Sequence, residues 1–370
     1  MKSAGLVEIS KKEFRDHIMS KKFLIILAII LTATIVGMIG GAFDYNKQIQ
    51  NYAEHQVEAQ ENGHSSYSYM WSKPSVMTIF SQIGTIIASL GAILGIAMGF
   101  DLITREKESK SLKILLSHPI YRDEVINGKA VGGVAALILA LIVTFVVCVA
   151  LLMIFSIIPG VSEIEYIMIF GIAAFLMIFS YFAISLFMST VSENSGSALI
   201  YTLIIFIFLT GLLPVLVSGS VMDLLAGDAP QPPESLFKTS STGALSSVTY
   251  AVSSDGDDEY YENPYETDEW QNYENKINEY WQKRQAISDF FNLLSPTNNF
   301  QYISSYIAYP QIYRNMYDIS FNVEDDSSIP ETVDVADVMG DLAKNFIALI
   351  AFPAVFFGLA YVRFMRMDIR

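Results

Sequence analysis

Six long stretches of the chain carry no charged residue, and they constrain the fold more than any other feature of the sequence. Five of them are 21 to 33 residues long and the sixth has 18; they are residues 23–43, 74–100, 130–162, 166–192, 194–222 and 345–362. A helix that crosses a bilayer needs about 20 mostly apolar residues. The pattern therefore predicts an all-α integral membrane protein with six transmembrane helices.

The composition agrees with this class. Of the 370 residues, 52% are hydrophobic and 16% are charged, whereas a soluble domain carries roughly a quarter charged residues. The first stretch has the basic flank of a secretory signal peptide, but its 21 residues exceed the usual apolar length of about 7–15. Five further stretches follow it, so we interpret the first as a transmembrane helix.

Basic residues predict the orientation. With six spans, fifteen Lys and Arg residues fall on one side of the membrane: Lys2, Lys11, Lys12, Arg15, Lys21, Lys22, Arg105, Lys107, Lys110, Lys113, Arg122, Lys129, Arg363, Arg366 and Arg370. Basic residues near spans favour the cytoplasmic side. Both termini are therefore predicted to be cytoplasmic.

This topology divides the chain into four parts. Residues 1–22 form a cytoplasmic amphipathic helix, and residues 23–217 hold spans one to five with a cytoplasmic loop at 101–129. Residues 218–344 form a large extracytoplasmic insertion, and 345–370 hold the sixth span and a cytoplasmic tail. Ser218–Asp341 contains 22 Asp and Glu against five Lys and Arg, so the acidity of the chain resides in the insertion.

The insertion also carries a helical pattern. Apolar and aromatic residues recur at helical spacing from Trp270 to Leu294, and Ser295-Pro296 ends the pattern. We expect Trp281 and Phe291 to be buried on this face. The insertion is therefore predicted to be a helical cap over the outer mouth of the bundle.

The amino-terminal segment has the signature of a short helix over residues 9–20. Ser10 is placed as the cap and Glu13 follows three residues later, which is the spacing of a capping box. Ile9 would then dip into the lipid headgroups. A plain basic flank is the alternative.

Small residues line one face of the second span. Gly84, Gly91, Gly95 and Gly99 recur at spacings that place them nearly together on a helix. Small residues allow close helix approach in lipid. We predict that they pack within one bundle, with a dimer interface as the alternative.

No catalytic or metal site is predicted. No phosphate-binding G-x-x-x-x-G-K-[ST] motif occurs, and the nearest fragment, Asn127-Gly128-Lys129-Ala130, lacks the first glycine and the hydroxyl. The single cysteine, Cys148, cannot form an intrachain disulfide, and the histidines show no metal-ligand spacing. We expect no cofactor in this chain.

Between the second and third spans lies an amphipathic stretch from Glu106 to Pro119. Leu112, Leu115 and Leu116 share one face of a helix that Pro119 must end. Glu106 and Glu108 alternate with lysines on the polar side, and a mixed-charge surface beside leucines fits a protein groove better than lipid. Asp101, just before it, is interpreted as a gate or anchor, or as an interfacial carboxylate paired with Arg105.

The residues of this loop resemble a family. The matching positions are Phe100-Asp101, Glu106, Glu108, Ser111 to Pro119 (SLKILLSHP), Arg122 and Gly128-Lys129. They resemble the permease subunits of type-two ABC transporters, most closely the six-span branch typified by the nitrous oxide reductase maturation permease. Lys110-Ser111 stands where that family has Gly-Thr.

The resemblance implies a function for the loop. In this family it is a coupling helix that docks into a separate ATPase subunit, and two permeases work with two ATPases. Carried over, the ATPase-coupling residues are Asp101, Glu106, Glu108, Leu112, Leu115, Leu116, Pro119 and Arg122. ATP and magnesium would bind the partner ATPase, and a second permease copy or paralogue would complete the unit. The chain would serve as an exporter in a prokaryotic plasma membrane, with the lipid bilayer and no nucleic acid among its partners.

Two other functions fit the composition. One is an ATP-independent receptor or scaffold that acts through its acidic ectodomain. The other is an ion-driven carrier, although carriers usually show internal repeats or charged residues at the midplane.

Overall fold

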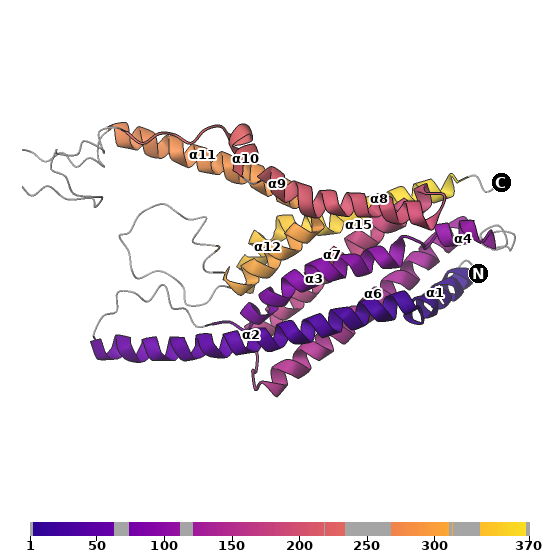
Figure 1. The fold of residues 1–370 in the computed structure, drawn as a ribbon, viewed down its shortest axis with the longest axis horizontal. Coiled ribbons are helices and arrows are strands. Elements are labelled where there is room, and N and C mark those ends of the chain that lie inside the picture. Colours follow the sequence, from indigo (N-terminus) through magenta and orange to yellow (C-terminus); the bar gives the residue numbers. More distant parts are fainter. Residues whose placement is uncertain are drawn as a thin grey trace, which may run out of the picture. The chain divides into compact units, whose positions relative to one another are not determined.

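The computed structural model describes residues 3–62, 74–111, 121–217, 219–233, 268–310, 313 and 334–367, and the regular elements in these ranges are helical. The helices (Figure 1) are α1 (Ser3–Ile18), α2 (Lys21–Asn62), α3 (Met77–Gly99), α4 (Thr104–Glu108), α6 (Arg122–Ile154), α7 (Val161–Val191), α8 (Ser195–Ile207), the π-helix η2 (Phe208–Leu212), α9 (Leu213–Val217), α10 (Gly219–Ala226), α11 (Asp268–Leu293), α12 (Pro296–Ala308), α14 (Val335–Asp341) and α15 (Ala343–Met365).

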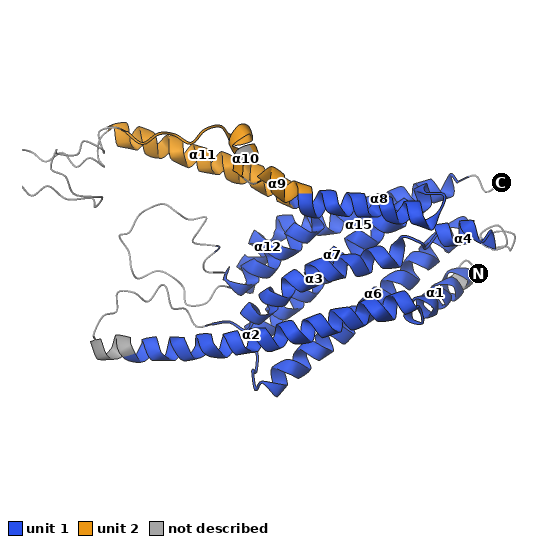
Figure 2. Cartoon of the chain, in the orientation of Figure 1, with its two compact units in different colours: residues 1–211, 293–370 blue, residues 212–292 orange. Residues whose placement is uncertain are grey.

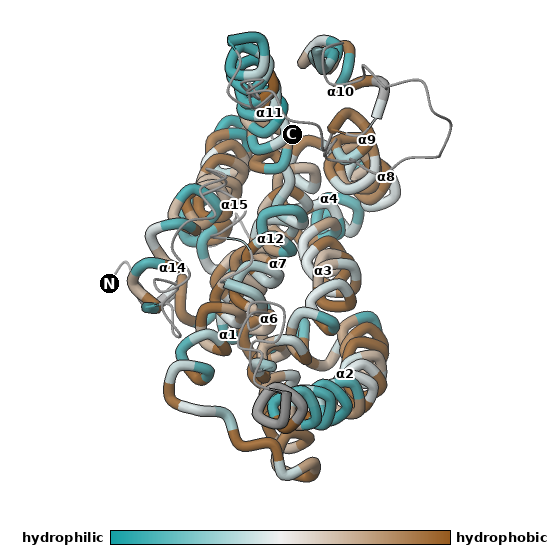
Figure 3. Tube along the Cα trace, turned by 90° about the vertical axis from the view of Figure 1, so that its left-hand side faces the viewer, coloured by the Kyte–Doolittle hydropathy of each residue, from teal (hydrophilic) through white to brown (hydrophobic). Residues whose placement is uncertain are grey.

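The predicted fold class is confirmed. Within the described ranges, six helical segments are long and apolar enough to cross a membrane: Lys21–Val57, Met77–Glu108, Arg122–Ile154, Val161–Val191, Ser195–Val217 and Ala343–Met365. They carry most of the hydrophobic colour in Figure 3, whereas α11 is largely hydrophilic.

The chain forms two compact units (Figure 2). The first comprises residues 1–211 and 293–370, and the second comprises residues 212–292. The predicted insertion, residues 218–344, contributes to both. In the first unit, α1 and the end of α15 lie at the same end of the bundle (Figure 1). We call this end, where α4 also lies, the α1–α4 end.

The first unit is built around α3 and α7. In their apolar windows 61% and 67% of the residues are buried, against 17–28% in the other spans. The glycine face of α3 lies against α7. A Cβ on Gly95 would stand 2.5 Å from the carbonyl oxygen of Ile178, and one on Gly99 would stand 2.7 Å from that of Phe182. Only glycine permits this approach, which places α7 against the segment that follows α3.

The helix α2 is much longer than a bilayer is thick. Its 42 residues span about 60 Å at 1.5 Å per residue, roughly twice the hydrocarbon thickness of about 30 Å. Gly37 and Gly41 bring it against Ile83 and Ile79 of α3. The polar second half of α2 continues beyond this apolar contact.

At the other end of the bundle, α12 is inserted among α3, α7 and α15. Its Phe300 packs on Phe170 of α7 with ring centroids 5.3 Å apart, and Ser304 faces Gly84 of α3. The Tyr181 hydroxyl lies 2.6 Å from the Thr297 hydroxyl. These residues of the insertion are thus part of the helix bundle, where we expected a cap lying over it.

The polar groups at the start of α12 are satisfied locally. The Ser295 hydroxyl caps the helix by accepting a hydrogen bond from the backbone N–H of Asn298. The Asn299 side chain donates to the carbonyl oxygens of Leu293 and Ser295 and accepts from Asn345 of α15 at 2.9 Å. A turn buried in this position is tolerated because its backbone acceptors are bonded.

The second unit contains α9, α10 and α11. Met222, Ala226 and Tyr280 form a small buried cluster in it. We expected Trp281 in the core of this region, which is wrong: Trp281 is 56% exposed, whereas Tyr280 is 9% exposed. The predicted stop at Ser295-Pro296 is confirmed, because α11 runs from Asp268 to Leu293 and ends two residues before Ser295.

The fifth span is irregular near Pro214. Between α8 and α9 the chain widens into η2, which ends at Leu212, two residues before the proline. Proline has no N–H and its ring displaces the carbonyl four residues earlier, so the local hydrogen-bond pattern must change.

The amino-terminal helix begins earlier than predicted. Because α1 starts at Ser3, Ser10 lies inside it, and its hydroxyl donates to the Leu6 carbonyl oxygen. The predicted capping box is therefore wrong. Ile9 is buried against Gly128 of α6, so this side chain packs on protein.

Candidate functional site

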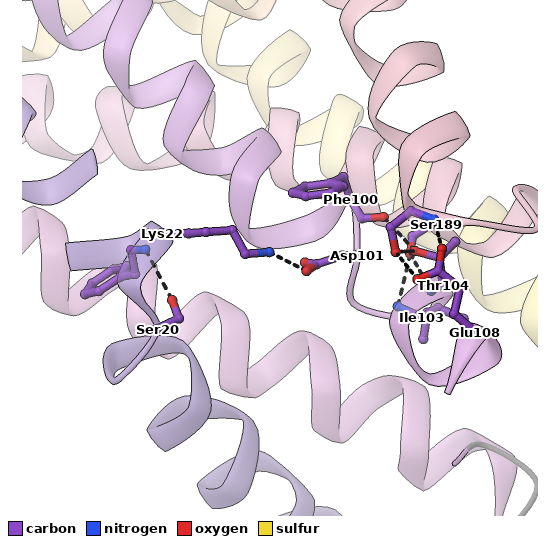
Figure 4. Close-up of polar contacts among 10 residues, drawn as sticks. Ser20, Lys22, Phe100, Asp101, Ile103, Thr104, Glu108 and Ser189 are labelled. Atoms are coloured by element: carbon purple, nitrogen blue, oxygen red, sulfur yellow. Dashed lines mark hydrogen bonds and ion pairs between the residues drawn. The ribbon is translucent and has the colours of Figure 1, made fainter. Parts of the chain in front are cut away.

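The site lies at the α1–α4 end, where α4 contacts the junction between α7 and α8. The Ser189 hydroxyl, from the last turn of α7, accepts hydrogen bonds from the backbone N–H groups of Ile103 and Thr104 at 3.0 and 3.1 Å (Figure 4). Helix-starting N–H groups have no intrahelical acceptor. Ser189 supplies one and fixes the start of α4 on α7.

Lys107 binds the end of α7. Its ammonium donates to the carbonyl oxygens of Thr190 and Ser192, each at 2.9 Å, and to that of Ser189 at 3.4 Å. The last carbonyls of a helix lack intrahelical donors and carry the negative end of its dipole. A cation at this position satisfies both the hydrogen bonds and the charge.

Glu108 binds the start of α8 in the complementary way. Its Oε1 accepts from the Ser195 backbone N–H at 2.7 Å, and its Oε2 accepts from the Ser195 hydroxyl at 3.1 Å. A carboxylate is stabilised at a helix amino terminus. Lys107 and Glu108 together bind the two sides of the α7–α8 turn.

Glu106 points to a different partner, the buried Lys129 of α6. The Lys129 ammonium lies 2.8 Å from Glu106 Oε1 and 2.7 Å from Glu13 Oε1 of α1. The Lys129 side chain is 2% exposed. A charge at this depth is tolerated only with partners of opposite sign, so α1, α4 and α6 meet at one ammonium group.

Close backbone contact reinforces this junction. A Cβ on Gly132 of α6 would stand 2.7 Å from the Glu13 Cβ and 2.8 Å from the Ser10 carbonyl oxygen. The nearest match to a phosphate-binding loop, Gly128-Lys129, therefore lies inside a helix. There the glycine packs on α1 and the lysine forms ion pairs.

Asp101 pairs with Lys22 at the start of α2 (Figure 4). The Lys22 ammonium also lies 4.7 Å from the centre of the Phe100 ring, a cation–π distance. From the sequence, Arg105 was one candidate partner of Asp101, and the structure places Lys22 there. The turn after α3 is thus bound to α2.

Lys110 interrupts the predicted helix. We expected one helix from Glu106 to Pro119, but α4 ends at Glu108 and Lys110 has a φ of 56°. This left-handed conformation is unfavourable for residues other than glycine. This backbone conformation explains why the family that the loop resembles has glycine at this position.

The remaining predicted coupling residues divide into two groups. Arg122 donates to the carbonyl oxygens of Met365 and Met367 at 3.4 and 2.7 Å, which places it at the end of α15. Leu112, Leu115, Leu116 and Pro119 lie outside the described residues.

Four participants were not predicted as site residues. Lys107 was counted as a basic residue of the loop, Lys129 as a basic residue and as part of the Gly-Lys pair, Glu13 was assigned to a cap, and Ser189 was not considered. The Gly-Lys pair in the family pattern was the available signal for Lys129. No periodicity marks Ser189, because only the fold brings it to α4.

A cavity of about 310 Å³ lies beside these contacts, bordered by α1, α4, α6, the start of α2 and the end of α3. His17 lines it, and burial lowers the pKa of its imidazole, against the opposing effects of Glu13 and Asp101. In the described part of the chain, no group of three or more His, Cys, Asp or Glu side chains is placed to hold a metal ion.

Six apolar helices, with charged contacts gathered at one end of the bundle, define the chain as a polytopic membrane protein. A family model described as ABC-2 family transporter protein matches residues 7–369. Because the match covers almost the whole sequence, the chain belongs to this family and is a permease subunit of an ABC transporter, a transport protein and not an enzyme. The family implies an ABC ATPase as partner in general. A comparison with curated proteins found no match.

Proposed function

We propose that this chain is the membrane-spanning subunit of an ATP-driven exporter, and that a separate ATPase moves it through residues 101–129. Two permeases, identical or paralogous, would enclose the pathway, and the ATPases would bind ATP and magnesium. The α1–α4 end would face the cytoplasm of a prokaryotic cell, which the fifteen basic residues on that side favour. We also propose that the chain belongs to the branch of the family that serves the maturation of nitrous oxide reductase.

One observation carries this proposal. Three consecutive residues of α4 bind three different partners: Glu106 binds Lys129, Lys107 binds the end of α7, and Glu108 binds the start of α8. A displacement of α4 must therefore break these contacts or move the helices that hold them. The segment is well suited to pass motion from a docked protein to α1, α6, α7 and α8 together.

Two variants separate docking from transmission. Leu116→Asp would place a carboxylate in the predicted ATPase groove and should weaken association by about two decades or more. Glu108→Ala removes the contact with α8 and should leave association intact while transport and permease-stimulated ATP hydrolysis fall. The measurements are co-purification with the ATPase and hydrolysis in proteoliposomes.

Lys110→Ala is the control, because Lys110 lies in the same segment and exposed ion pairs contribute only about 0–1 kcal/mol. It should change neither association nor hydrolysis. If Leu116→Asp leaves both intact in a folded permease, the coupling role is wrong. The receptor or scaffold function would then be the better interpretation.

A further inference from the structure

The cavity at the α1–α4 end lies at the depth of lipid headgroups. It is bordered by Lys22, directly before the first apolar stretch, and by Asp101, directly after the second. Charged residues that flank transmembrane helices mark the interface between hydrocarbon and water. With about 310 Å³, the cavity has the size of a small-ligand site.

Two polar atoms in the cavity lining are buried and have no hydrogen-bond partner among the described residues: Glu106 Oε2 and His17 Nε2. Lys129 occupies the other oxygen of Glu106. A carboxylate oxygen can only accept hydrogen bonds, and a neutral imidazole protonated on Nδ1 presents Nε2 as an acceptor. Glu106 Oε2 therefore calls for a hydrogen-bond donor, and His17 Nε2 accepts one in that tautomer.

The exposed part of the lining carries both signs of charge. Arg105 and Lys12 are exposed there, and so is Asp16, while the Lys12 ammonium lies 3.8 Å from Glu13 Oε1. Basic side chains at the level of the headgroups attract the anionic parts of lipids. A ligand that fits both ends would carry a donor ammonium group and, a few bonds away, an anion.

We propose that this cavity binds the phosphoethanolamine headgroup of a bilayer lipid, with the ammonium at Glu106 Oε2 and His17 Nε2 and the phosphate at Arg105 and Lys12. Phosphocholine has the same charges, but its quaternary nitrogen has no N–H to donate. Phosphoglycerol lacks the ammonium. The site is thus selective through hydrogen-bond donation, and it does not depend on the ATPase.

The test varies the lipid and leaves the protein unchanged. The full chain is purified in detergent, and native mass spectrometry measures retention of phosphatidylethanolamine, its N-methyl and N,N-dimethyl forms, phosphatidylcholine and phosphatidylglycerol with identical acyl chains. Retention should fall along the methylation series, to about tenfold less for phosphatidylcholine, since hydrogen bonds to charged groups are the strong ones. Equal retention across the series would overturn the proposal.

Two adjacent lysines supply a matched pair of variants. Lys12→Ala, alone or with Arg105→Ala, should reduce retention of phosphatidylethanolamine, whereas Lys11→Ala should not, because Lys11 lies outside the lining. Equal effects of Lys11→Ala and Lys12→Ala would contradict the assignment. Soluble glycerophosphoethanolamine is added as a competitor. Displacement at concentrations equal to the lipid would assign the site to a soluble ligand and overturn the lipid assignment.

Discussion

At the scale of single residues, Lys110 is held in a conformation that favours glycine. Its φ of 56° costs a side-chain-bearing residue roughly 1–2 kcal/mol. Lys110→Gly should therefore raise the free energy of unfolding by about 1 kcal/mol, measured as a higher thermal midpoint of the purified permease. Ser109→Gly is the control, because Ser109 has a φ of −79°. It should not stabilise the protein, and equal gains from both changes would show that the backbone conformation is not the cause.

A second prediction at this scale concerns the effect of His17 on how stability depends on pH. Burial lowers the pKa of its imidazole below the ordinary value of 6.5, so the folded protein favours the neutral form. Its contribution to stability is complete above about pH 6.5 and is lost as the pH falls through the lowered pKa. The thermal midpoint should drop on acidification, and less steeply in His17→Gln.

Charged groups face His17, so the quantity to compare is the difference in thermal midpoint between the parent protein and His17→Gln at each pH. Glu13, Asp101, Lys129 and Lys22 all act on the imidazole, and all four are present in both proteins. Subtracting the His17→Gln profile from that of the parent isolates the histidine. Parallel profiles between pH 5 and 7 would contradict a buried neutral His17.

At the scale of elements, α10 and α11 depend on one aromatic side chain. Tyr280 is buried with Met222 and Ala226, and deleting a buried aromatic costs about 3–5 kcal/mol. Tyr280→Ala should make α11 much more sensitive to limited proteolysis in the full chain. Trp281→Ala, one position along, should have little effect because Trp281 is mostly exposed. Equal sensitivity would indicate that the pair is not held by this core.

The elements also show what the sequence could predict. The spans could be predicted because lipid demands long apolar stretches. The packing role of the α3 glycines could be predicted because close helix contact demands small residues. The position of α12 could not be predicted, because a helix with aromatic and polar residues has the same sequence pattern beside a bundle as inside one. The pairing of Lys129 with Glu13 joins residues 116 positions apart, and no local pattern carries that information.

At the scale of the whole molecule, the remaining prediction is the orientation in the membrane. After Cys148→Ser, a cysteine at Lys110 should react with an impermeant thiol reagent only in permeabilised cells, whereas one at Glu54, in the polar half of α2, should react in intact cells. The basic residues at the α1–α4 end are the physical reason. Labelling at Lys110 in intact cells would reverse the orientation.

The length of α2 has a mechanical consequence. The helix is held near its beginning by the pair between Lys22 and Asp101, while its far end lies about 60 Å away at 1.5 Å per residue. Gly37 and Gly41 also pack the helix on α3, so the free arm is the polar half beyond Gly41, about 30 Å long at 1.5 Å per residue. A tilt of about 10° where this contact ends displaces the far tip by about 5 Å, so a small rotation at the bundle becomes a large excursion beyond it.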